Sequence, residues 1–220
     1  YGFGYSRVLA AIIAQHGDDR GLVLPPIVSP IQVVIIPIPF KGQEEEIMGY
    51  ASKIKEILEK RWRTTLDDRK DITPGEKFYH WELMGVPVRA EVGPREVAES
   101  TVTLARRDTL ERIKVGLDEL ESKVEELMES IASNLRERSM RMMMGLIGDA
   151  KSVDEVKRLL RERRIARVEW CGSVECAEKL KEEAGGEIRG ERYDIVERPR
   201  DSCIVCGREA KKVVYVARAY

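Results

Sequence analysis

Four cysteines, all in the last quarter of the chain, restrict the fold of that region more than any other feature of the sequence. They form two short pairs, Cys171 with Cys176 and Cys203 with Cys206. Such pairs allow four thiolates to converge tetrahedrally on one zinc ion, and Gly207 suits the tight turn in which backbone N–H groups approach sulfur. We therefore predict a structural Zn2+ site that holds together a domain with a small core.

Three alternatives exist for these cysteines, namely disulfides, free thiols in a core and a catalytic zinc. Clustering in one region favours metal binding in a reducing compartment over disulfides scattered along the chain. Four cysteine ligands leave no position for a water molecule, which argues against a catalytic zinc. The disulfide and free-thiol alternatives remain open from the sequence.

Charge and hydropathy limit the partners of the chain. With 38 basic and 39 acidic residues among 220, the net charge is -1, so any nucleic-acid surface must be local. The longest apolar runs, VLAAIIA and VVIIPI, are far shorter than the about 20 residues that cross a bilayer, and no basic-then-apolar leader precedes them. We expect a soluble, cytoplasmic protein that binds neither membranes nor DNA.

Residues 31–106 alternate between strand and helix patterns, which predicts a compact α/β unit of about a hundred residues. The β-branched run from Ile31 is typical of a buried strand in a parallel or mixed sheet. The helix expected from Glu44 has one apolar stripe, made of Ile47, Ala51, Ile54 and Leu58. Further strands are expected at residues 63–68, 86–92 and 100–106, with residues 93–99 as a turn.

A short helix at residues 73–85 carries both start and stop signals. Thr73 is the expected N-cap, Pro74 the first helical residue and Glu76 the second half of a capping box, and Gly85 ends the helix.

The rest of the chain predicts one long helix and a second small α/β domain. From Thr109 to about Met144, apolar residues recur at steps of three and four, which favours a helix packed on the sheet over a free coiled coil. These residues are Leu110, Ile113, Leu117, Leu120, Val124, Leu127, Ile131 and Leu135. A helix at 153–164, a strand at 166–170, a helix at 176–186 and a strand at 211–220 follow.

The first residues read differently from the α/β unit. The run RVLAAIIAQHG has no polar side until Gln15, so as a helix it would be buried all round and end at Gly17. Nothing nearby is long enough to surround it, so we expect upstream sequence to do so. Pro25, Pro26 and Pro30 then predict a stiff connector at a domain boundary.

Several long strings resemble prolyl-tRNA synthetases of the archaeal and eukaryotic type. They are RVLAAIIAQHGDDRGLVLPP, KFYHWELMGVPVRAEVGPREV and TVTLARRDT, together with the four-cysteine tail that ends in tyrosine. The resemblance implies an α/β (α+β) chain. Residues 1–28 would be the last strand and helix of an antiparallel class II catalytic core, 29–125 a mixed-sheet anticodon-binding domain, and 126–220 a smaller α/β zinc-binding domain.

This resemblance implies a proline–tRNA ligase, which activates proline with ATP and Mg2+ and transfers it to tRNA(Pro). The implied partners are tRNA(Pro), ATP, proline and a second subunit of a homodimer formed through the catalytic domain. The chain alone is expected to be inactive, because the first two class II motifs lie outside it. Two alternatives are a stand-alone tRNA-binding accessory module and a structural zinc interaction domain without catalysis.

The resemblance also implies a phosphate site near the start. Arg7 matches the arginine of the third class II motif, at the junction of a strand and a helix, which binds the γ-phosphate of ATP. Gly4 would keep side chains away from the nucleotide. A flexible tag or frayed terminus is the alternative for this stretch. The signature residues His16, Asp18, Asp19 and Arg20 are expected to cap the helix and fix the loop that leaves it.

Two residues, Glu82 and Arg89, match positions that the family uses to read the anticodon, whose guanines offer N1 and N2 to a carboxylate and O6 and N7 to an arginine. Glu82 would lie on the helix at 73–85 and Arg89 on the following strand, with Lys77 as a phosphate contact. A plain surface ion pair is the alternative for Glu82 and Arg89. Tyr220, at the chain end, is a candidate active-site contact, with fraying as the alternative.

Overall fold

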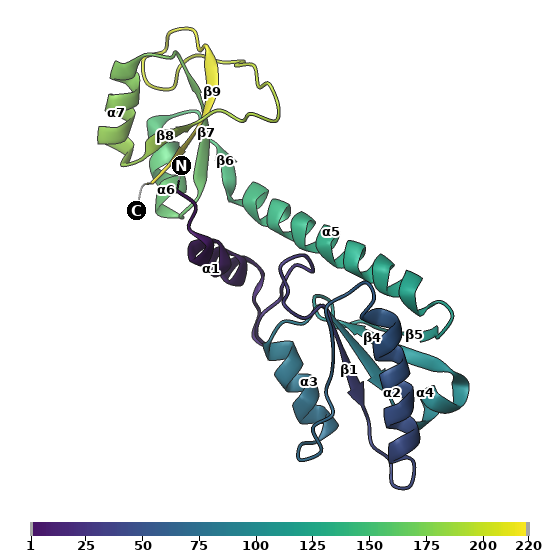
Figure 1. Cartoon of the computed structure of the whole chain (residues 1–220). Helices are drawn as coiled ribbons and strands as arrows, with labels where there is room; N and C mark the ends of the chain where they lie inside the picture. The colour runs from purple at the N-terminus through teal and green to yellow at the C-terminus, as the bar shows by residue number, and fades with distance from the viewer. Residues whose placement is uncertain (1, 219–220) are drawn as a thin grey trace. The chain divides into compact units, whose positions relative to one another are not determined.

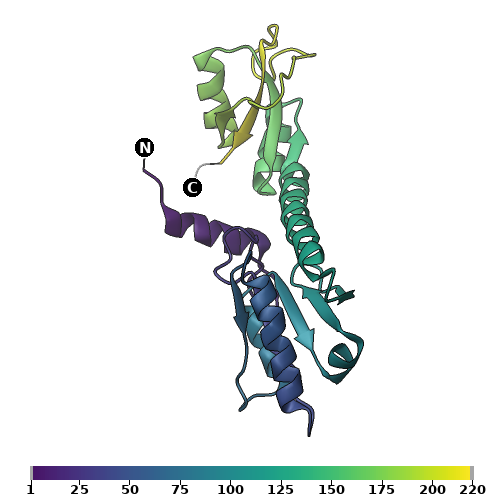
Figure 2. The same cartoon turned by 45° about the vertical axis from the view of Figure 1, so that its right-hand side comes forward.

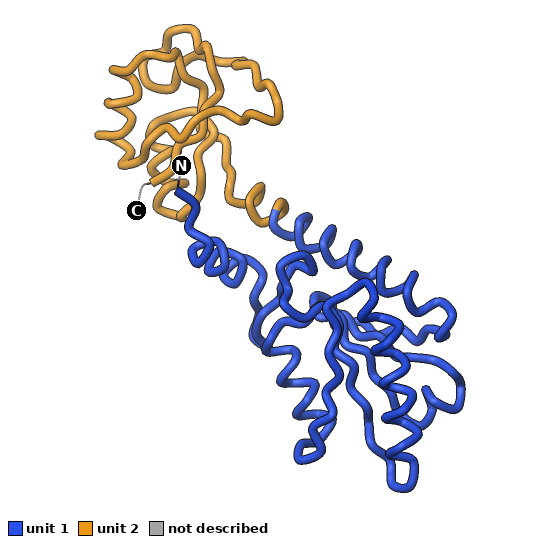
Figure 3. The backbone as a smooth tube through the Cα atoms, viewed as in Figure 1, with its two compact units in different colours: residues 1–139 blue, residues 140–220 orange. Residues whose placement is uncertain are grey.

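The computed structural model describes residues 2–218. Two compact units divide the chain, residues 1–139 and residues 140–220 (Figure 3). Each unit has its own sheet and its own hydrophobic core. Among the described residues, no helix has the length and apolar character needed to cross a membrane.

The first unit is built on a five-stranded mixed sheet with the order β2-β1-β3-β4-β5 (Figure 1). β1 runs parallel to both of its neighbours, and β3, β4 and β5 are antiparallel to one another in turn. The strands are β1 (Val33–Pro37), β2 (Thr64–Leu66), β3 (Val88–Val92), β4 (Thr101–Arg106) and β5 (Arg112–Gly116). The mixed sheet expected from the sequence is confirmed.

Helices cover both faces of this sheet, which explains why β1 is apolar throughout. Val33 and Ile35 belong to the core formed with α2 (Glu44–Leu58) and α5 (Leu120–Leu146). Val34 and Ile36 lie on the opposite face, in a smaller cluster with two aromatic side chains of α3 (Pro74–Leu83). Figure 2 shows α2 lying along the sheet. The predicted stripe of α2 is buried at all four positions, Ile47, Ala51, Ile54 and Leu58.

The start and stop signals predicted for α3 are confirmed. The Thr73 side chain accepts a hydrogen bond from the Glu76 backbone N–H at 3.3 Å, and the Glu76 carboxylate accepts one from the Thr73 N–H at 2.7 Å. Pro74 is the first helical residue, and Gly85 follows the helix with a φ of +71°. These signals fix where α3 begins and ends, and hence where its side chains face the sheet.

The sequence prediction was wrong between residues 109 and 119, where the long helix was expected to begin. Residues 112–116 form β5, in which Ile113 pairs with Leu104 and Val115 with Val102. The spacing of three and four was coincidental there, because β4 offers an unpaired edge and residues 112–116 alternate as a strand does. Further along, α5 buries the predicted positions Leu120, Val124, Leu127, Ile131 and Leu135. The turn expected at 93–99 is instead a short helix, α4 (Pro94–Glu99).

The N-terminal helix, α1 (Tyr5–His16), ends near the expected Gly17 but buries none of its residues. Residues 2–4 carry no strand, because a strand needs a neighbour to satisfy its backbone groups. Val8, Leu9 and Ile13 are between 40% and 51% exposed. The all-round burial predicted for this helix is therefore not met within the described residues.

The second unit contains a four-stranded sheet with the order β6-β7-β9-β8. β6 and β7 are parallel, whereas β9 is antiparallel to β7 and β8. Its core joins Val156, Leu160, Val168, Leu180 and Val214. The elements are β6 (Ile147–Asp149), α6 (Val153–Arg161), β7 (Ile165–Trp170), α7 (Val174–Ala184), β8 (Glu187–Gly190) and β9 (Lys212–Ala217).

The small α/β arrangement predicted for this unit is confirmed, although β6 and β8 were not predicted. Both are edge strands of three or four residues, too short to show an alternating pattern. Residues 191–211, between β8 and β9, contain no helix and no sheet strand, only an isolated bridge between Ser202 and Glu209.

Candidate functional site

A pocket of about 350 Å3 lies in the first unit, between α3, the β3–β5 strands and the loop after α1. We call it the arginine pocket, because five of its lining residues are arginines. Its charged and aromatic lining consists of Arg20, Phe78, Tyr79, Trp81, Glu82, Arg89, Arg106, Arg107 and Arg112. A concave surface with guanidinium groups and aromatic rings suits an anionic ligand that carries flat rings.

Glu82 and Arg89, the two predicted anticodon-reading residues, meet inside this pocket. Arg89 Nη1 lies 3.1 Å from Glu82 Oε1, and the two side chains are only 12% and 11% exposed. Arg89 also donates from Nε to Glu91 Oε1 at 2.9 Å, and its guanidinium lies 4.2 Å from the centre of the Phe78 ring. Arg89 and Glu82 therefore form a mostly buried ion pair that further contacts hold in place, which distinguishes it from a plain surface ion pair.

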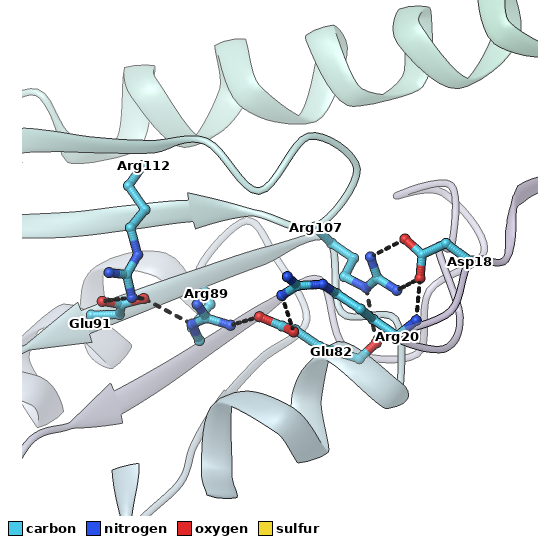
Figure 4. Close-up of polar contacts among 7 residues, drawn as sticks. All are labelled: Asp18, Arg20, Glu82, Arg89, Glu91, Arg107 and Arg112. Carbon is cyan, nitrogen blue, oxygen red and sulfur yellow. Dashed lines mark hydrogen bonds and ion pairs between the residues drawn. The ribbon is translucent and has the colours of Figure 1, made fainter. Parts of the chain in front are cut away.

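The network continues to both sides of that pair (Figure 4). Arg112 donates to both oxygens of Glu91 at 2.7 and 2.8 Å. On the other side, Arg20 Nη1 lies 3.2 Å from Glu82 Oε2. Because each carboxylate accepts from more than one arginine, the cluster has an excess of positive charge next to its acceptor groups.

The loop after α1 is fastened to the pocket through a buried arginine. Arg107, whose side chain is 2% exposed, donates to both oxygens of Asp18 at 2.6 and 2.8 Å and to the Glu82 backbone oxygen at 2.9 Å. The hydrogen bond from Arg107, helped by the Arg20 N–H, lowers the pKa of Asp18 to about 2. Asp18 is therefore ionised in all but strongly acidic solution.

Two glycines allow this loop to lie directly against the end of α3. Gly21 has a φ of +130°, and a Cβ on it would come within 2.5 Å of the Leu83 Cα. Gly85 also has a positive φ, and a Cβ there would lie 2.6 Å from the Leu22 side chain. The Leu22 N–H donates to the Leu83 oxygen at 3.0 Å, so larger residues at either glycine would separate the loop from α3.

The other signature residues, His16 at the end of α1 and Asp19 in the loop, make fewer contacts than Asp18 and Arg20. His16 Nδ1 is buried without a hydrogen-bond partner among residues 2–218, and burial, with the nearby Arg138, lowers the pKa of His16. Asp19 is exposed. The structural role predicted for the signature is therefore seen at Asp18, which Arg107 and the Arg20 backbone N–H hold in place.

Lys77 lies on α3 but does not reach the arginine pocket. Its ammonium is buried, donates to the Asp67 backbone oxygen at 2.8 Å and lies 3.7 Å from the Asp67 carboxylate. Burial alone would raise the pKa of Asp67, but hydrogen bonds from Arg69 and Trp81 and the Lys77 charge hold it well below its usual range. For Lys77 to touch a phosphate it would have to leave this pair.

The four cysteines of the second unit gather as predicted. Their Sγ atoms all lie within 4.8 Å of one another, and three of the four side chains are buried. Cys206 and Cys171 have Sγ atoms 3.8 Å apart, close to the about 3.8 Å between sulfurs of a tetrahedral zinc site with bonds of about 2.3 Å. All four are free thiols in the structure, and the cluster can hold a metal ion.

Backbone turns at the two cysteine pairs have similar geometry. Gly207 after Cys206 has a φ of +69°, and Gly172 after Cys171 has a φ of +88°. The Gly207 N–H donates to the Cys203 oxygen at 2.9 Å. The tight turn predicted at Gly207 is thus present, and Gly172 shares its positive φ.

The thiols differ in acidity because their neighbours differ. A hydrogen bond from Arg208 Nε, at 3.3 Å, lowers the pKa of Cys206 to about 6. For Cys176, a hydrogen bond with Ser173 acts downward, but burial and the neighbouring thiols outweigh it and raise the pKa to about 11. A bound metal ion would favour the thiolate at all four positions.

The candidate phosphate site at the start of the chain is only partly built here. Arg7 is the third residue of α1, is exposed, and its side chain makes no hydrogen bond or ion pair with any other residue in the range 2–218. Gly4 caps α1, and a Cβ on it would meet only the Arg7 Cβ at 3.6 Å, so nothing described requires glycine there. Tyr220 lies outside the described residues.

Sequence reasoning missed the pocket residues Arg107 and Arg112, and also Glu91, which pairs with Arg89 and Arg112. Arg107 directly follows β4 and Arg112 begins β5, so a correct strand assignment for β5 would have placed Arg112 beside β4, in the same sheet as Arg89. No local pattern could have paired Asp18 with Arg107, because the two are 89 positions apart.

Comparisons with known proteins assign both units. Residues 32–127 match the family model described as an anticodon binding domain, and residues 153–220 match the one described as the C-terminal region of prolyl-tRNA synthetase. A proline–tRNA ligase of Pyrococcus horikoshii is 49% identical over 99% of the chain, and one of Ignicoccus hospitalis is 43% identical over 97%.

A solved structure also matches nearly the whole chain. It is a prolyl-tRNA synthetase from Cryptosporidium parvum complexed with halofuginone and AMPPNP, with a TM-score of 0.88 and 34% identity over 98% of the chain. The chain covers 45% of that structure, and 45% and 46% of the Ignicoccus and Pyrococcus proteins. It therefore spans just under half the length of the proteins that it matches.

Proposed function

The chain belongs to the prolyl-tRNA synthetase family, and from that premise we propose that it reads the anticodon of tRNA(Pro) for a proline–tRNA ligase. In this proposal the ligase activates proline with ATP and Mg2+ and transfers it to the tRNA. The proposed parts are residues 1–28 as the end of a class II catalytic domain, 29–125 as the anticodon-binding domain and 126–220 as the zinc-binding domain.

The observation that carries the proposal is the Glu82–Arg89 pair inside a pocket of the domain that matches an anticodon binding domain. Glu82 would accept hydrogen bonds from N1 and N2 of a guanine, and Arg89 would donate to O6 and N7. Arg89 is already held by Glu91 and stacked on Phe78, so little ordering remains to be done when RNA binds. Tyr79, which is 74% exposed, adds an aromatic surface at the pocket edge on which a base could stack.

At the start of the chain, we assign Arg7 to the γ-phosphate of ATP and Gly4 to the edge of the same site. Arg7 is exposed on a rigid helix and has no partner among residues 2–218, so its charge is free to meet a phosphate group. The apolar, exposed side of α1 fits a helix that other parts of a ligase would cover. Tyr220 and Lys77 keep their proposed contacts, with the active site and with tRNA respectively, although Lys77 would first have to leave Asp67.

For the cysteine cluster, we assign a structural zinc ion held by Cys171, Cys176, Cys203 and Cys206. The donor set consists of four soft thiols whose sulfurs lie within 4.8 Å of one another, which suits Zn2+ and leaves no ligand position for water. Its role would be to hold residues 191–211 to the sheet of the second unit. A cytoplasmic location and a homodimer formed through the catalytic domain complete the proposal.

An accessory module without catalysis is not favoured. The proline–tRNA ligases of Pyrococcus and Ignicoccus match 99% and 97% of the chain, including the helix that carries Arg7. Neither a free RNA-binding module nor a zinc interaction domain needs that exposed apolar helix.

The test compares binding of tRNA(Pro) with binding of the same tRNA after its two anticodon guanines are replaced by adenine. Wild-type chain, Glu82→Gln and Arg89→Gln are measured at one salt concentration, and Lys114→Gln, a surface residue of β5 paired with Glu99, is the matched control for loss of charge. We expect both pocket variants to lose most of the preference for guanine and the control to keep it. Equal losses on both RNAs would remove the pair as a base reader.

A further inference from the structure

The two oxygens of the Glu82 carboxylate are each occupied by a different arginine. Oε1 accepts from Arg89 at 3.1 Å and Oε2 accepts from Arg20 at 3.2 Å (Figure 4). In the proposed reading of guanine, this carboxylate must present two acceptor positions to the base edge. Each carboxylate oxygen has two acceptor positions, so Arg20 fills one of the two on Oε2 and competes there with an incoming guanine.

The two arginines are held very differently. Arg89 is 12% exposed and is fixed by Glu82, Glu91 and the Phe78 ring. Arg20 is 53% exposed, and its guanidinium makes a single contact among the described residues, the one to Glu82. Half-exposed ion pairs contribute little to stability, so Arg20 is the partner that can leave.

The backbone of Arg20 is nevertheless fixed. Its N–H donates to Asp18 Oδ1 at 2.9 Å, and Asp18 is held by the buried Arg107. The next residue, Gly21, lies directly against Leu83 at the end of α3. The Arg20 side chain therefore turns about a stationary base, and its release from Glu82 leaves the loop and α3 in place.

We propose that Arg20 is a latch on the base-reading carboxylate, closed over Glu82 Oε2 in the free protein and displaced when guanine binds. The inference rests on the proposed function, because it requires Glu82 to accept hydrogen bonds from the base. The latch keeps the carboxylate paired and oriented before RNA arrives. It also lowers the affinity for RNA, because only the fraction of molecules with the latch open can bind.

If Arg20 acts as this latch, its removal should change the affinity for RNA in the opposite direction to that expected from charge alone. Removing a positive charge from an RNA-binding pocket weakens binding. Removing the latch frees the acceptor oxygen, so Arg20→Gln should bind a guanine-bearing loop about two- to fivefold more tightly, the range expected for losing one half-exposed ion pair. Most of the gain should lie in a faster association rate, because the free protein no longer waits for the latch to open.

The experiment measures association and dissociation of this chain with an anticodon stem–loop of tRNA(Pro), with all variants compared at one salt concentration and the affinities then repeated over a salt series. The matched control is Arg112→Gln, which lies in the same pocket and is 51% exposed but pairs with Glu91 instead of Glu82. We expect Arg20→Gln to bind the guanine loop more tightly than wild-type chain does. We expect it to bind an adenine-substituted loop no more tightly than wild type, and the control variant to show no tightening on either loop. In a Glu82→Gln background, Arg20→Gln should have no tightening effect, because the latch has lost its acceptor.

Two results separate the failure of the latch from the failure of the proposed function. If Glu82→Gln loses the preference for guanine but Arg20→Gln binds as wild type or more weakly, the latch is refuted and the reading of guanine stands. A drop of about one in the dependence of log affinity on log salt for Arg20→Gln would identify Arg20 as a phosphate contact instead. If Glu82→Gln keeps the preference for guanine, both proposals are wrong.

Discussion

Loss of the proposed metal ion from the cysteine cluster should destabilise the second unit selectively. The perturbation is Cys203→Ser, because this residue is 2% exposed and is the most buried of the four cysteines. It begins the second pair of ligands and stands in the segment 191–211, which has no helix or sheet strand of its own. A serine there removes one ligand with almost no change in size.

The size of the effect follows from the length of chain that the metal ties together. A link from Cys171 to Cys203 closes a loop of about 33 residues, and such a link lowers the entropy of the unfolded chain by the equivalent of about 4 kcal/mol. Whole domains are stable by about 5–15 kcal/mol. Loss of this tie should therefore remove a large part of the stability of the second unit and none of that of the first.

Hydrogen exchange measured by mass spectrometry resolves the two units. We expect wild-type chain to carry one metal ion, and both a chelator and Cys203→Ser to lower protection of β7 and β9 amides, while β1 and β3 stay protected. The control is Ser202→Ala, an exposed neighbour that is not a ligand. A chelator should add little to Cys203→Ser, and equal protection of β7 and β9 with and without chelator would refute the reasoning.

Three further predictions concern the first unit. Asp18→Asn should destabilise the chain by about 1 kcal/mol above pH 4, allowing for the partial exposure of Asp18. Because Arg107 lowers the pKa of Asp18 to about 2, this contribution should fade as the pH falls from 4 to 2, and denaturant unfolding at a series of pH values should show the two proteins converging. Gly21→Ala should lower the free energy of unfolding by about 2 kcal/mol, because of backbone strain and collision with α3. Gly49→Ala, exposed within α2 with open space around it, should instead raise the free energy of unfolding by up to about 1 kcal/mol. Equal shifts of the two variants in thermal unfolding would contradict this. In the full-length ligase, Arg7→Ala should lower ATP–pyrophosphate exchange by about a hundredfold with tRNA binding unchanged, and unimpaired exchange would rule out its phosphate role.

Local signals were sufficient for most elements of the fold. The capping box at Thr73, the stripe of α2 and the continuous apolar run of β1 depend on neighbours in sequence, so they could be predicted. The hairpin of β4 and β5 could not, because residues 110–117 satisfy helix and strand spacing at once and only the edge of β4 decides between them. Leu110, with a φ of +63° in that hairpin, is the residue at which the helix prediction breaks down.

The site residues likewise divide into those that sequence could predict and those that it could not. Short spacing predicted the cysteine cluster, and resemblance to a family pointed to Glu82 and Arg89. The contacts of Asp18 and Arg20 with the pocket join distant parts of the chain, so no window of sequence contains them. The exposure of α1 was not predictable either, because an apolar helix indicates that something covers it but not whether the cover belongs to the same chain.

The central claim, that this chain reads guanine in an anticodon, is tested most directly by two dissociation constants of the wild-type chain. They are measured for the anticodon stem–loop of tRNA(Pro) and for the same RNA with its two anticodon guanines replaced by adenine, at one salt concentration. The reading by Glu82 and Arg89 predicts binding at least about tenfold weaker for the adenine RNA. Equal dissociation constants would contradict it.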